Sequence, residues 1–158
     1  MGALSWTSLI NVLAAVVPVV ATAIIGNLVT LPNIPTWYAH LAKPAFNPPN
    51  WVFAPAWTTL YILMAAAFFR ILQTPGVRTA AIVLFLVQLV LNAAWSWVFF
   101  SQRSPYGALV VIALLWIAIA ATILTFWQVD RIASGLLWPY LAWVSFAAVL
   151  NWEIYRLN

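Results

Sequence analysis

The chain contains no cysteine and one histidine among 158 residues, and its charge comes from only six basic and two acidic side chains. The absence of cysteine excludes disulfides, thiolate nucleophiles and Cys-ligated metal sites. Cations this few and scattered form no nucleic-acid footprint, so no nucleic-acid partner is expected. With 5% charged residues, the chain cannot have the charged exterior of an ordinary soluble domain.

Groups able to do acid–base chemistry are equally scarce. His40, Asp130 and Glu153 lie far apart in the sequence, and no triad, carboxylate pair, metal cluster or glycine-rich phosphate loop is present. Proton-coupled transport needs a relay of ionisable groups within the membrane, and none is found. Hydrolysis and ion pumping are therefore disfavoured, and neither a metal nor a resident cofactor is expected.

Apolar sequence, in contrast, is abundant, because 66% of the residues are hydrophobic. A helix that crosses the hydrocarbon core of a bilayer needs about 20 such residues. The pattern predicts an all-α polytopic membrane protein in which residues 1–158 form one bundle of five transmembrane helices. The predicted spans are residues 6–29, 51–72, 79–101, 105–128 and 134–155.

Basic residues in the connectors would normally orient such a bundle in the membrane. Here the two sides tie, with three basic residues each. One side carries Arg70, Arg78 and Arg131, and the other carries Lys43, Arg103 and Arg156. The sequence therefore leaves the orientation open. The last three connectors are short, which makes consecutive helices antiparallel neighbours.

The first connector, residues 30–50, is longer and contains five prolines, which prevent a continuous helix. We expect a shaped loop that folds over a pocket like a lid, with Trp51 where the loop becomes a helix. Aromatic rings are concentrated in and beside this loop. Each ring has two interpretations, as part of the interfacial aromatic belt or as part of a binding site.

The third predicted span carries a polar stripe, because Gln88, Asn92 and Ser96 recur every four residues, with Trp95 beside them. Unpaired polar groups are costly in lipid, so this stripe should face the interior of the bundle. It indicates hydrogen bonds between helices, a polar patch in an internal cavity, or both.

Several motifs in this order resemble one known family. They are Trp37-Tyr38, Lys43-Pro44, Asn47-Pro48-Pro49, Trp51-Val52, Leu60-Tyr61, "QLVLNAAWSWVFF" at 88–100 and "PYLAWVSFAAVLN" at 139–151. Together they are similar to the tryptophan-rich sensory protein and translocator protein (TspO/MBR) family, also called peripheral benzodiazepine receptors. The likeness covers almost the whole chain, including its five spans.

The resemblance implies a homodimer of five-helix bundles, each with a pocket under the first connector. Family members bind porphyrins such as protoporphyrin IX, sterols, and benzodiazepine or isoquinoline drugs. Matched by position, the expected ligand-binding residues are Trp51, Asn92, Trp95, Trp138, Trp143, Ala147 and Leu150. Lys43 is added as a cation for the porphyrin propionates. The expected location is a bacterial cell membrane, or the mitochondrial outer membrane in a eukaryote.

The chain also departs from the family pattern. Phe46 stands where the family usually has tryptophan, and Gly107 stands where mammalian members have a tryptophan early in the fourth helix. Trp152 replaces the tyrosine of the C-terminal sterol motif, which is weak even when intact. Ligand preferences are therefore expected to differ, and tight cholesterol binding is not predicted.

Three functions remain open at this point. The favoured one is a receptor or sensor that binds porphyrin and other lipophilic ligands. The second is an enzyme that degrades porphyrin in light, in which Trp51 and Trp138 would be the photochemical residues. The third is a transporter of porphyrin or sterol. The short hairpins and the lack of a pair of broken helices argue weakly against it, although Pro18 inside the first predicted span could act as a kink.

Overall fold

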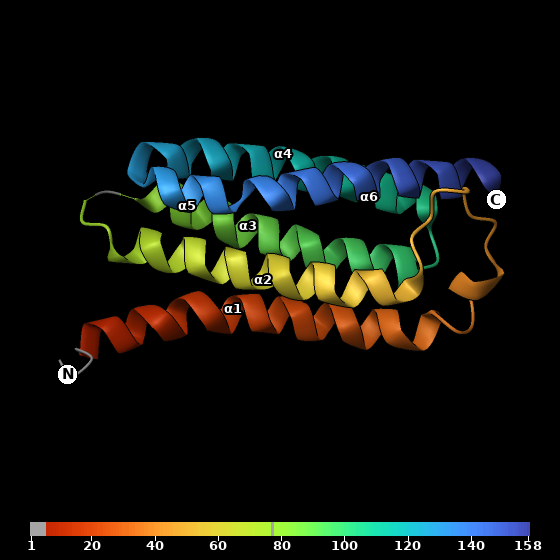
Figure 1. The fold of residues 1–158 in the computed structure, drawn as a ribbon, viewed down its shortest axis with the longest axis horizontal. Coiled ribbons are helices and arrows are strands. Elements are labelled where there is room, and N and C mark those ends of the chain that lie inside the picture. The colour runs from red at the N-terminus through yellow and green to blue at the C-terminus, as the bar shows by residue number, and fades with distance from the viewer. Residues whose placement is uncertain (1–5, 77) are drawn as a thin grey trace.

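A computed structural model describes residues 6–76 and 78–158, and all regular structure in this part of the chain is helical. The long helices lie side by side along one axis (Figure 1), with the start of α1 at one end and the C-terminus at the other. They are α1 (Trp6–Thr30), α2 (Asn50–Gln73), α3 (Thr79–Ser96), α4 (Pro105–Val129) and α6 (Trp138–Leu157), with the short α5 (Arg131–Leu136) before α6.

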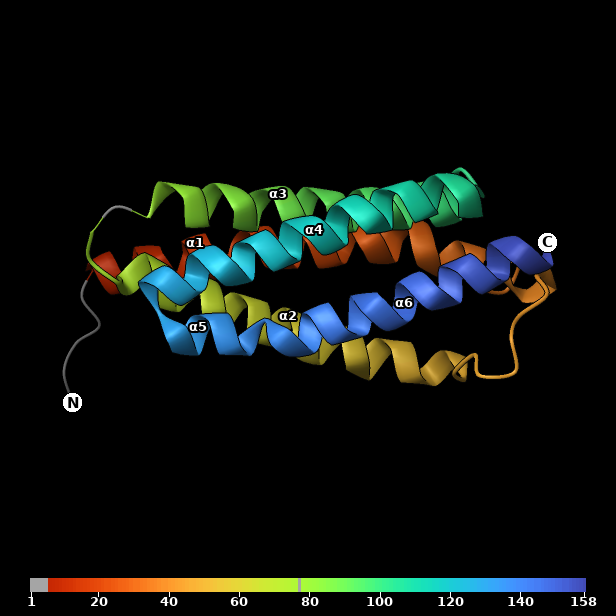
Figure 2. The same ribbon diagram turned by 90° about the horizontal axis from the view of Figure 1, so that it is seen from above.

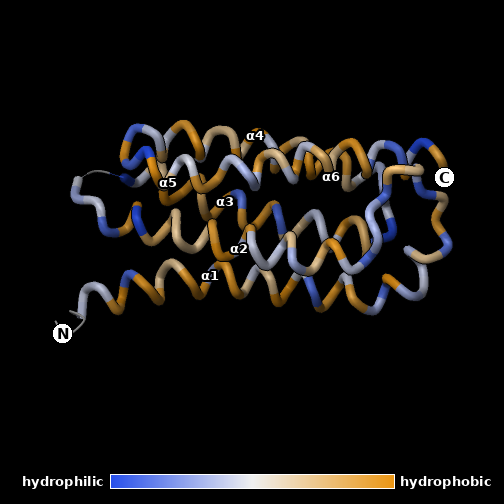
Figure 3. Tube along the Cα trace, in the orientation of Figure 1, coloured by the Kyte–Doolittle hydropathy of each residue, from blue (hydrophilic) through white to orange (hydrophobic). Residues whose placement is uncertain are grey.

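Five segments are long and apolar enough to cross a membrane, with α5 and α6 forming one segment. Large apolar side chains on their outer faces are exposed, for example Val90, Ile117 and Leu124, as expected where lipid replaces water. Figure 3 shows hydrophilic residues mainly at the ends of the bundle. The all-α, five-span prediction is confirmed, and the chain is a multi-pass integral membrane protein.

The order of packing in the bundle places α1 on the outside. It contacts α2 and α3, while α4 packs between α3 and α6, and α5 reaches across to α2. The common core is dense, with the rings of Phe68 and Phe85 stacked at 4.1 Å and those of Phe85 and Phe126 at 5.9 Å. Since α1 packs on α2 and α3 from one side only, it forms one outer wall of the bundle.

The fifth span differs from its predicted bounds of 134–155, because the helix begins earlier and is broken. Asp130 accepts hydrogen bonds from the N–H groups of Ile132 and Ala133 and so caps α5 at its start. The break falls at Leu137, between α5 and α6 (Figure 2). Pro139 explains it, since its missing N–H cannot continue the ladder from α5.

The end of α3 widens into a π-helical turn, Trp97–Ser101, in which the N–H of Gln102 donates to the carbonyl of Trp97. Regular α-helical geometry turns neighbouring residues about 100° apart. The wider turn lets the adjacent rings of Phe99 and Phe100 both face the interior, where both are buried. It therefore supplies an aromatic floor for the loop that follows α1.

An ion pair fixes the end of the bundle opposite this loop. The Arg70 guanidinium lies 2.8 Å from the Asp130 carboxylate and so joins α2 to the α4–α5 corner. Burial acts to raise the pKa of Asp130, but the N–H of Ala133, the Arg70 side chain and the N–H of Ile132 outweigh it. The pKa of Asp130 is therefore held below its ordinary value of 3.8.

Candidate ligand-binding site

A cavity of about 660 Å³ lies between α1, α2 and α6, and its walls are mostly apolar. This is the volume range of sites that bury most of a drug-sized ligand. The first connector and the π-helical turn close one end of it. The aromatic side chains that line it are Tyr38, Phe53, Trp57, Tyr61, Trp95, Phe99, Phe100 and Trp143.

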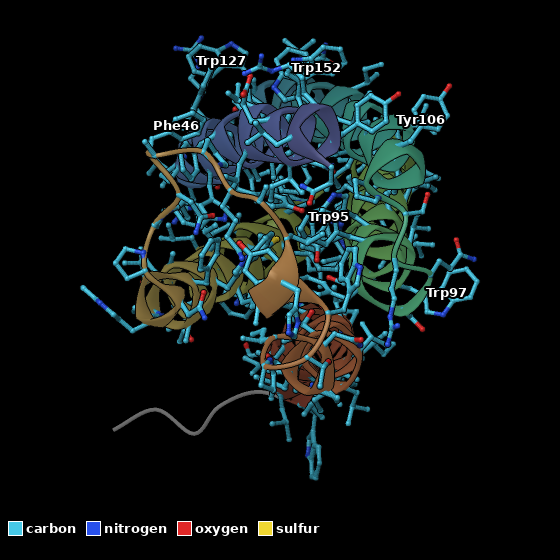
Figure 4. All side chains as sticks on the ribbon, turned by 90° about the vertical axis from the view of Figure 1, so that its right-hand side faces the viewer. Phe46, Trp95, Trp97, Tyr106, Trp127 and Trp152 are labelled. Carbon is cyan, nitrogen blue, oxygen red and sulfur yellow. The ribbon has the colours of Figure 1, made fainter. Side chains whose placement is uncertain are left out.

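The rings of the cavity wall contact one another and so hold one another in place. The indole of Trp57 stacks on Tyr61 at 5.5 Å, and the ring of Trp143 meets Phe53 edge-on at 6.0 Å. Seen from the loop end in Figure 4, Trp95 lies between the helices, whereas Trp97 and Tyr106 point outward. Such surfaces suit flat apolar molecules, because aromatic faces stack on one another.

The indole nitrogen of Trp95 is fixed by a polar partner from α6. Its N–H donates to Asn151 at 3.1 Å, and the Asn151 amide in turn donates to the carbonyl of Pro105 at 2.9 Å. These two bonds join the ends of α3, α4 and α6. Because its indole N–H is used in the bond to Asn151, Trp95 presents only its ring to the cavity.

The loop of residues 30–50 covers the cavity through Tyr38, whose ring packs on Phe99 and Phe100. The Tyr38 hydroxyl donates to Asn47 at 3.1 Å. Burial raises the pKa of the Tyr38 phenol above its ordinary value, although this hydrogen bond acts in the opposite direction. The ammonium of Lys43 lies 4.6 Å from the centre of the Tyr38 ring and donates to the Leu41 carbonyl at 3.0 Å.

The same loop is tied to the end of α6 by one side chain. The amide of Asn158 accepts from the backbone N–H of Ala42 and donates to the Ala42 carbonyl, both at 3.0 Å. The Asn158 amide nitrogen also donates to the carbonyl of Ile154 within α6. The side chain of the C-terminal residue Asn158 thus holds the loop at the backbone of Ala42.

A chain of hydrogen bonds runs from the cavity wall into the core. The Tyr61 hydroxyl donates to the Asn92 carbonyl oxygen at 3.3 Å, and the Asn92 amide donates to the Tyr140 hydroxyl at 2.8 Å. Tyr140 then donates to Gln88 at 2.9 Å, and the Gln88 amide faces the sulfur of Met64 at 4.0 Å. The predicted inward polar stripe is confirmed, and its partners come from α2 and α6.

The structure brings together four of the eight predicted ligand-binding residues. Trp95, Trp143, Ala147 and Leu150 all line the cavity. Asn92 lies behind Tyr61, to which it is hydrogen-bonded, and does not itself line the cavity.

The other three predicted residues lie away from the cavity wall. Trp51 is in the first turn of α2 with 72% of its surface exposed. Trp138 begins α6, inside the last membrane-spanning segment Arg131–Leu157, and is 56% exposed. The Lys43 ammonium is bound to the backbone of its own loop. The structure therefore separates Trp51 from Trp138, the two residues of the photochemical hypothesis.

The predicted ligand-binding residues include none from α1, and they omit Trp57 and Tyr61 of α2. Gly26 and Asn27 line the cavity from α1, and Trp57 and Tyr61 line it from α2. The predicted first span is apolar along most of its length, so no periodicity singled out its inner face. Tyr61 did carry a signal, since it is a polar aromatic residue within a span and one helical turn after Trp57.

The site offers few groups for chemistry. No group of three or more His, Asp or Glu side chains able to hold a metal occurs in residues 6–76 and 78–158. The cavity instead combines aromatic faces with the hydroxyl groups of Tyr61 and Ser96 and the amide of Asn27. Such a set can bind and orient a lipophilic molecule.

Comparisons with known proteins agree with this architecture. The model of the TspO/MBR family matches residues 14–156. The chain is 47% identical to "Tryptophan-rich protein TspO" of Chlorobaculum tepidum over 80% of this chain and 83% of that one. It is 38% identical to the protein of the same name in Archaeoglobus fulgidus over 96% and 99%. It is 41% identical to "Translocator protein" of Homo sapiens over 77% and 75%.

Proposed function

The chain belongs to the TspO/MBR family, and on this premise we propose that it is a membrane receptor or sensor for porphyrins and other flat lipophilic molecules. The names of its relatives, which include "Tryptophan-rich sensory protein" and "Translocator protein", support a sensory or receptor role. The proposed ligand site is the cavity between α1, α2 and α6.

The observation that carries this proposal is the combination of volume and ring content in one cavity. The cavity of about 660 Å³ has eight aromatic side chains in its walls, which supply the surface that a planar tetrapyrrole needs for stacking. A metal-free porphyrin needs no axial ligand from the protein. The scarcity of metal-ligating residues in the sequence is therefore compatible with this ligand.

Porphyrin propionates require cations or N–H donors, and the loop end of the site supplies a candidate. The Lys43 ammonium belongs to the same loop as Tyr38, which lines the cavity. Its present acceptor is a neutral backbone carbonyl, and a carboxylate forms the stronger hydrogen bond with an ammonium. We expect the propionates to lie at this end and the macrocycle to lie among the rings.

The test is a titration of the protein in nanodiscs with protoporphyrin IX in the dark, followed by quenching of tryptophan fluorescence. Ala147→Phe places a ring in the cavity and is expected to weaken binding at least about tenfold. Val149→Phe is the matched control, because Val149 is on the same helix but 54% exposed and outside the cavity lining. Equal affinities for the two variants would refute the site.

Illumination of the same samples, and a second preparation in sealed proteoliposomes, test the other two functions. After saturation in the dark, illumination should leave the porphyrin absorption bands unchanged if the protein is a receptor. Loss of those bands in light that requires a ligand-competent cavity would instead favour the degrading enzyme. Movement of porphyrin into sealed proteoliposomes would favour the transporter.

A further inference from the structure

The direction of the hydrogen-bond chain can be read from its buried end. A thioether sulfur accepts hydrogen bonds and donates none, so the amide nitrogen of Gln88 faces Met64. The Gln88 oxygen therefore faces Tyr140 and takes its proton. Tyr140 must then accept from the Asn92 amide nitrogen, which leaves the Asn92 oxygen to accept from Tyr61.

This direction decides what Tyr61 can offer a ligand. A phenol has one proton to donate and an oxygen that can also accept. The Tyr61 proton is committed to Asn92, so its oxygen faces the cavity as an acceptor only. Hydrogen bonds in a chain polarise one another in the direction of donation, which strengthens this acceptor.

Ser96 provides a second free group on the neighbouring wall. Hydroxyls on the other long helices donate to the carbonyl four residues earlier, as Thr58, Thr122 and Ser145 do at 2.7 to 2.8 Å. The Ser96 hydroxyl has no hydrogen-bond partner among the described residues, and it lines the cavity. Its oxygen can accept from a ligand, and its proton remains available.

The two oxygens meet opposite Gly26 of α1. A methyl group on Gly26 would lie 3.5 Å from the Ser96 oxygen and 3.9 Å from the Tyr61 oxygen. Both distances are ordinary contacts, so alanine fits there, yet it would cover both oxygens. We call Gly26, Tyr61 and Ser96 the polar notch of the cavity.

We propose that the polar notch selects lipophilic ligands that carry a hydroxyl or N–H donor on the edge that contacts the notch, with the Tyr61 oxygen as the acceptor. The inference rests on the proposed function, because it concerns the same cavity. A ligand edge that holds only acceptors finds the Tyr61 proton already used and can pair only with the Ser96 hydroxyl. A ligand edge with a donor can in addition pair with the Tyr61 oxygen, and this extra hydrogen bond is what the notch selects for.

The test uses two fluorescent probes, 1-hydroxypyrene and 1-methoxypyrene, of which only the first has a hydroxyl proton to donate. Binding to the protein in nanodiscs is followed by energy transfer from tryptophan to pyrene. The quantity compared is the dissociation constant of 1-methoxypyrene divided by that of 1-hydroxypyrene. Lipid partitioning of each probe is the same for every variant, so a change in this ratio reports the site.

In the wild-type protein 1-hydroxypyrene is expected to bind more tightly, and Tyr61→Phe should reduce the ratio about 2- to 12-fold, the effect of one net hydrogen bond. Tyr61→Phe also leaves the Asn92 oxygen unpaired, so Gly26→Ala is the second variant. It leaves the hydrogen-bond chain intact, covers both oxygens, and should reduce the ratio similarly. Tyr106→Phe, at an exposed tyrosine outside the cavity lining, should not change it.

The outcomes separate this inference from the function on which it rests. If both probes bind and the ratio in Tyr61→Phe and Gly26→Ala equals that of the wild type, the role of the notch is wrong while the cavity remains a ligand site. If neither probe reaches saturable binding in the wild type, the proposed ligand site fails, and the notch fails with it.

Discussion

Replacing Tyr140 by phenylalanine tests whether the buried hydrogen-bond chain holds the bundle together. Tyr140 is 1% exposed, and its hydroxyl accepts from Asn92 at 2.8 Å and donates to Gln88 at 2.9 Å. The substitution keeps the ring, including its edge-on contact with Trp57 at 6.3 Å. It therefore removes one oxygen and leaves two amide groups in the membrane core without that partner.

The expected cost follows from those two groups. In water-soluble proteins each unpaired buried group costs about 1 to 3 kcal/mol. In membranes the measured values are smaller, about 0.6 kcal/mol on average and at most about 1.7, because the unfolded state in the membrane also finds partners. The membrane values apply here, so Tyr140→Phe should lower the free energy of unfolding by about 1 to 3 kcal/mol.

The assay is reversible unfolding in mixed micelles with a rising fraction of denaturing detergent, followed by circular dichroism. Tyr106→Phe is the control, since Tyr106 is exposed (Figure 4) and its hydroxyl has no hydrogen-bond partner among the described residues. Adding Gln88→Leu to Tyr140→Phe should cost less than the sum of the single changes, because one unpaired group is then removed. Equal stability of Tyr140→Phe and Tyr106→Phe would refute the reasoning.

Two further changes test the ends of the bundle. The pKa of Asp130 is lowered in the folded state, so its contribution is present above the ordinary value of 3.8 and is lost as the pH falls through the folded value. Asp130→Asn should therefore lower the free energy of unfolding by about 1 kcal/mol at pH 7. It should also reduce the fall of the melting temperature at acid pH, and an unchanged fall would contradict the role of the Arg70 pair. Asn158→Ala removes both bonds to Ala42 and should speed hydrogen exchange of the Ala42 amide about fivefold, and unchanged protection would show that the loop is held elsewhere.

Composition and spacing were sufficient for the number of spans and for the inward face of α3. A run of about 20 apolar residues indicates a membrane-spanning helix. A four-residue repeat places polar groups on one face of a helix whatever surrounds it. The ion pair of Glu153 and Arg156 at 2.6 Å joins residues three apart in α6, a spacing that places both on one helix face. These are local features, determined within one helix.

Partners between helices could not be predicted in the same way. The rotation of α2 and α6 about their axes decides that Tyr61 and Tyr140 meet Asn92, and no sequence period encodes that rotation. The pairing of Arg70 with Asp130 likewise depends on how two connectors are placed side by side. For the same reason the sequence could not show that Trp138, which shares α6 with Trp143, is exposed and does not line the cavity.

The π-helical turn at residues 97–101 has a consequence for how this gene can change. A turn of this kind holds one residue more than the α-helical turn it replaces, so it is equivalent to a tolerated one-codon insertion. Deleting any one of its codons would restore α-helical geometry and rotate the following residues by about 100°. One of the two rings, Phe99 or Phe100, would then face lipid, and Tyr38 would lose half of its floor. We therefore expect selection against insertions and deletions at these five positions, even where one apolar residue can replace another.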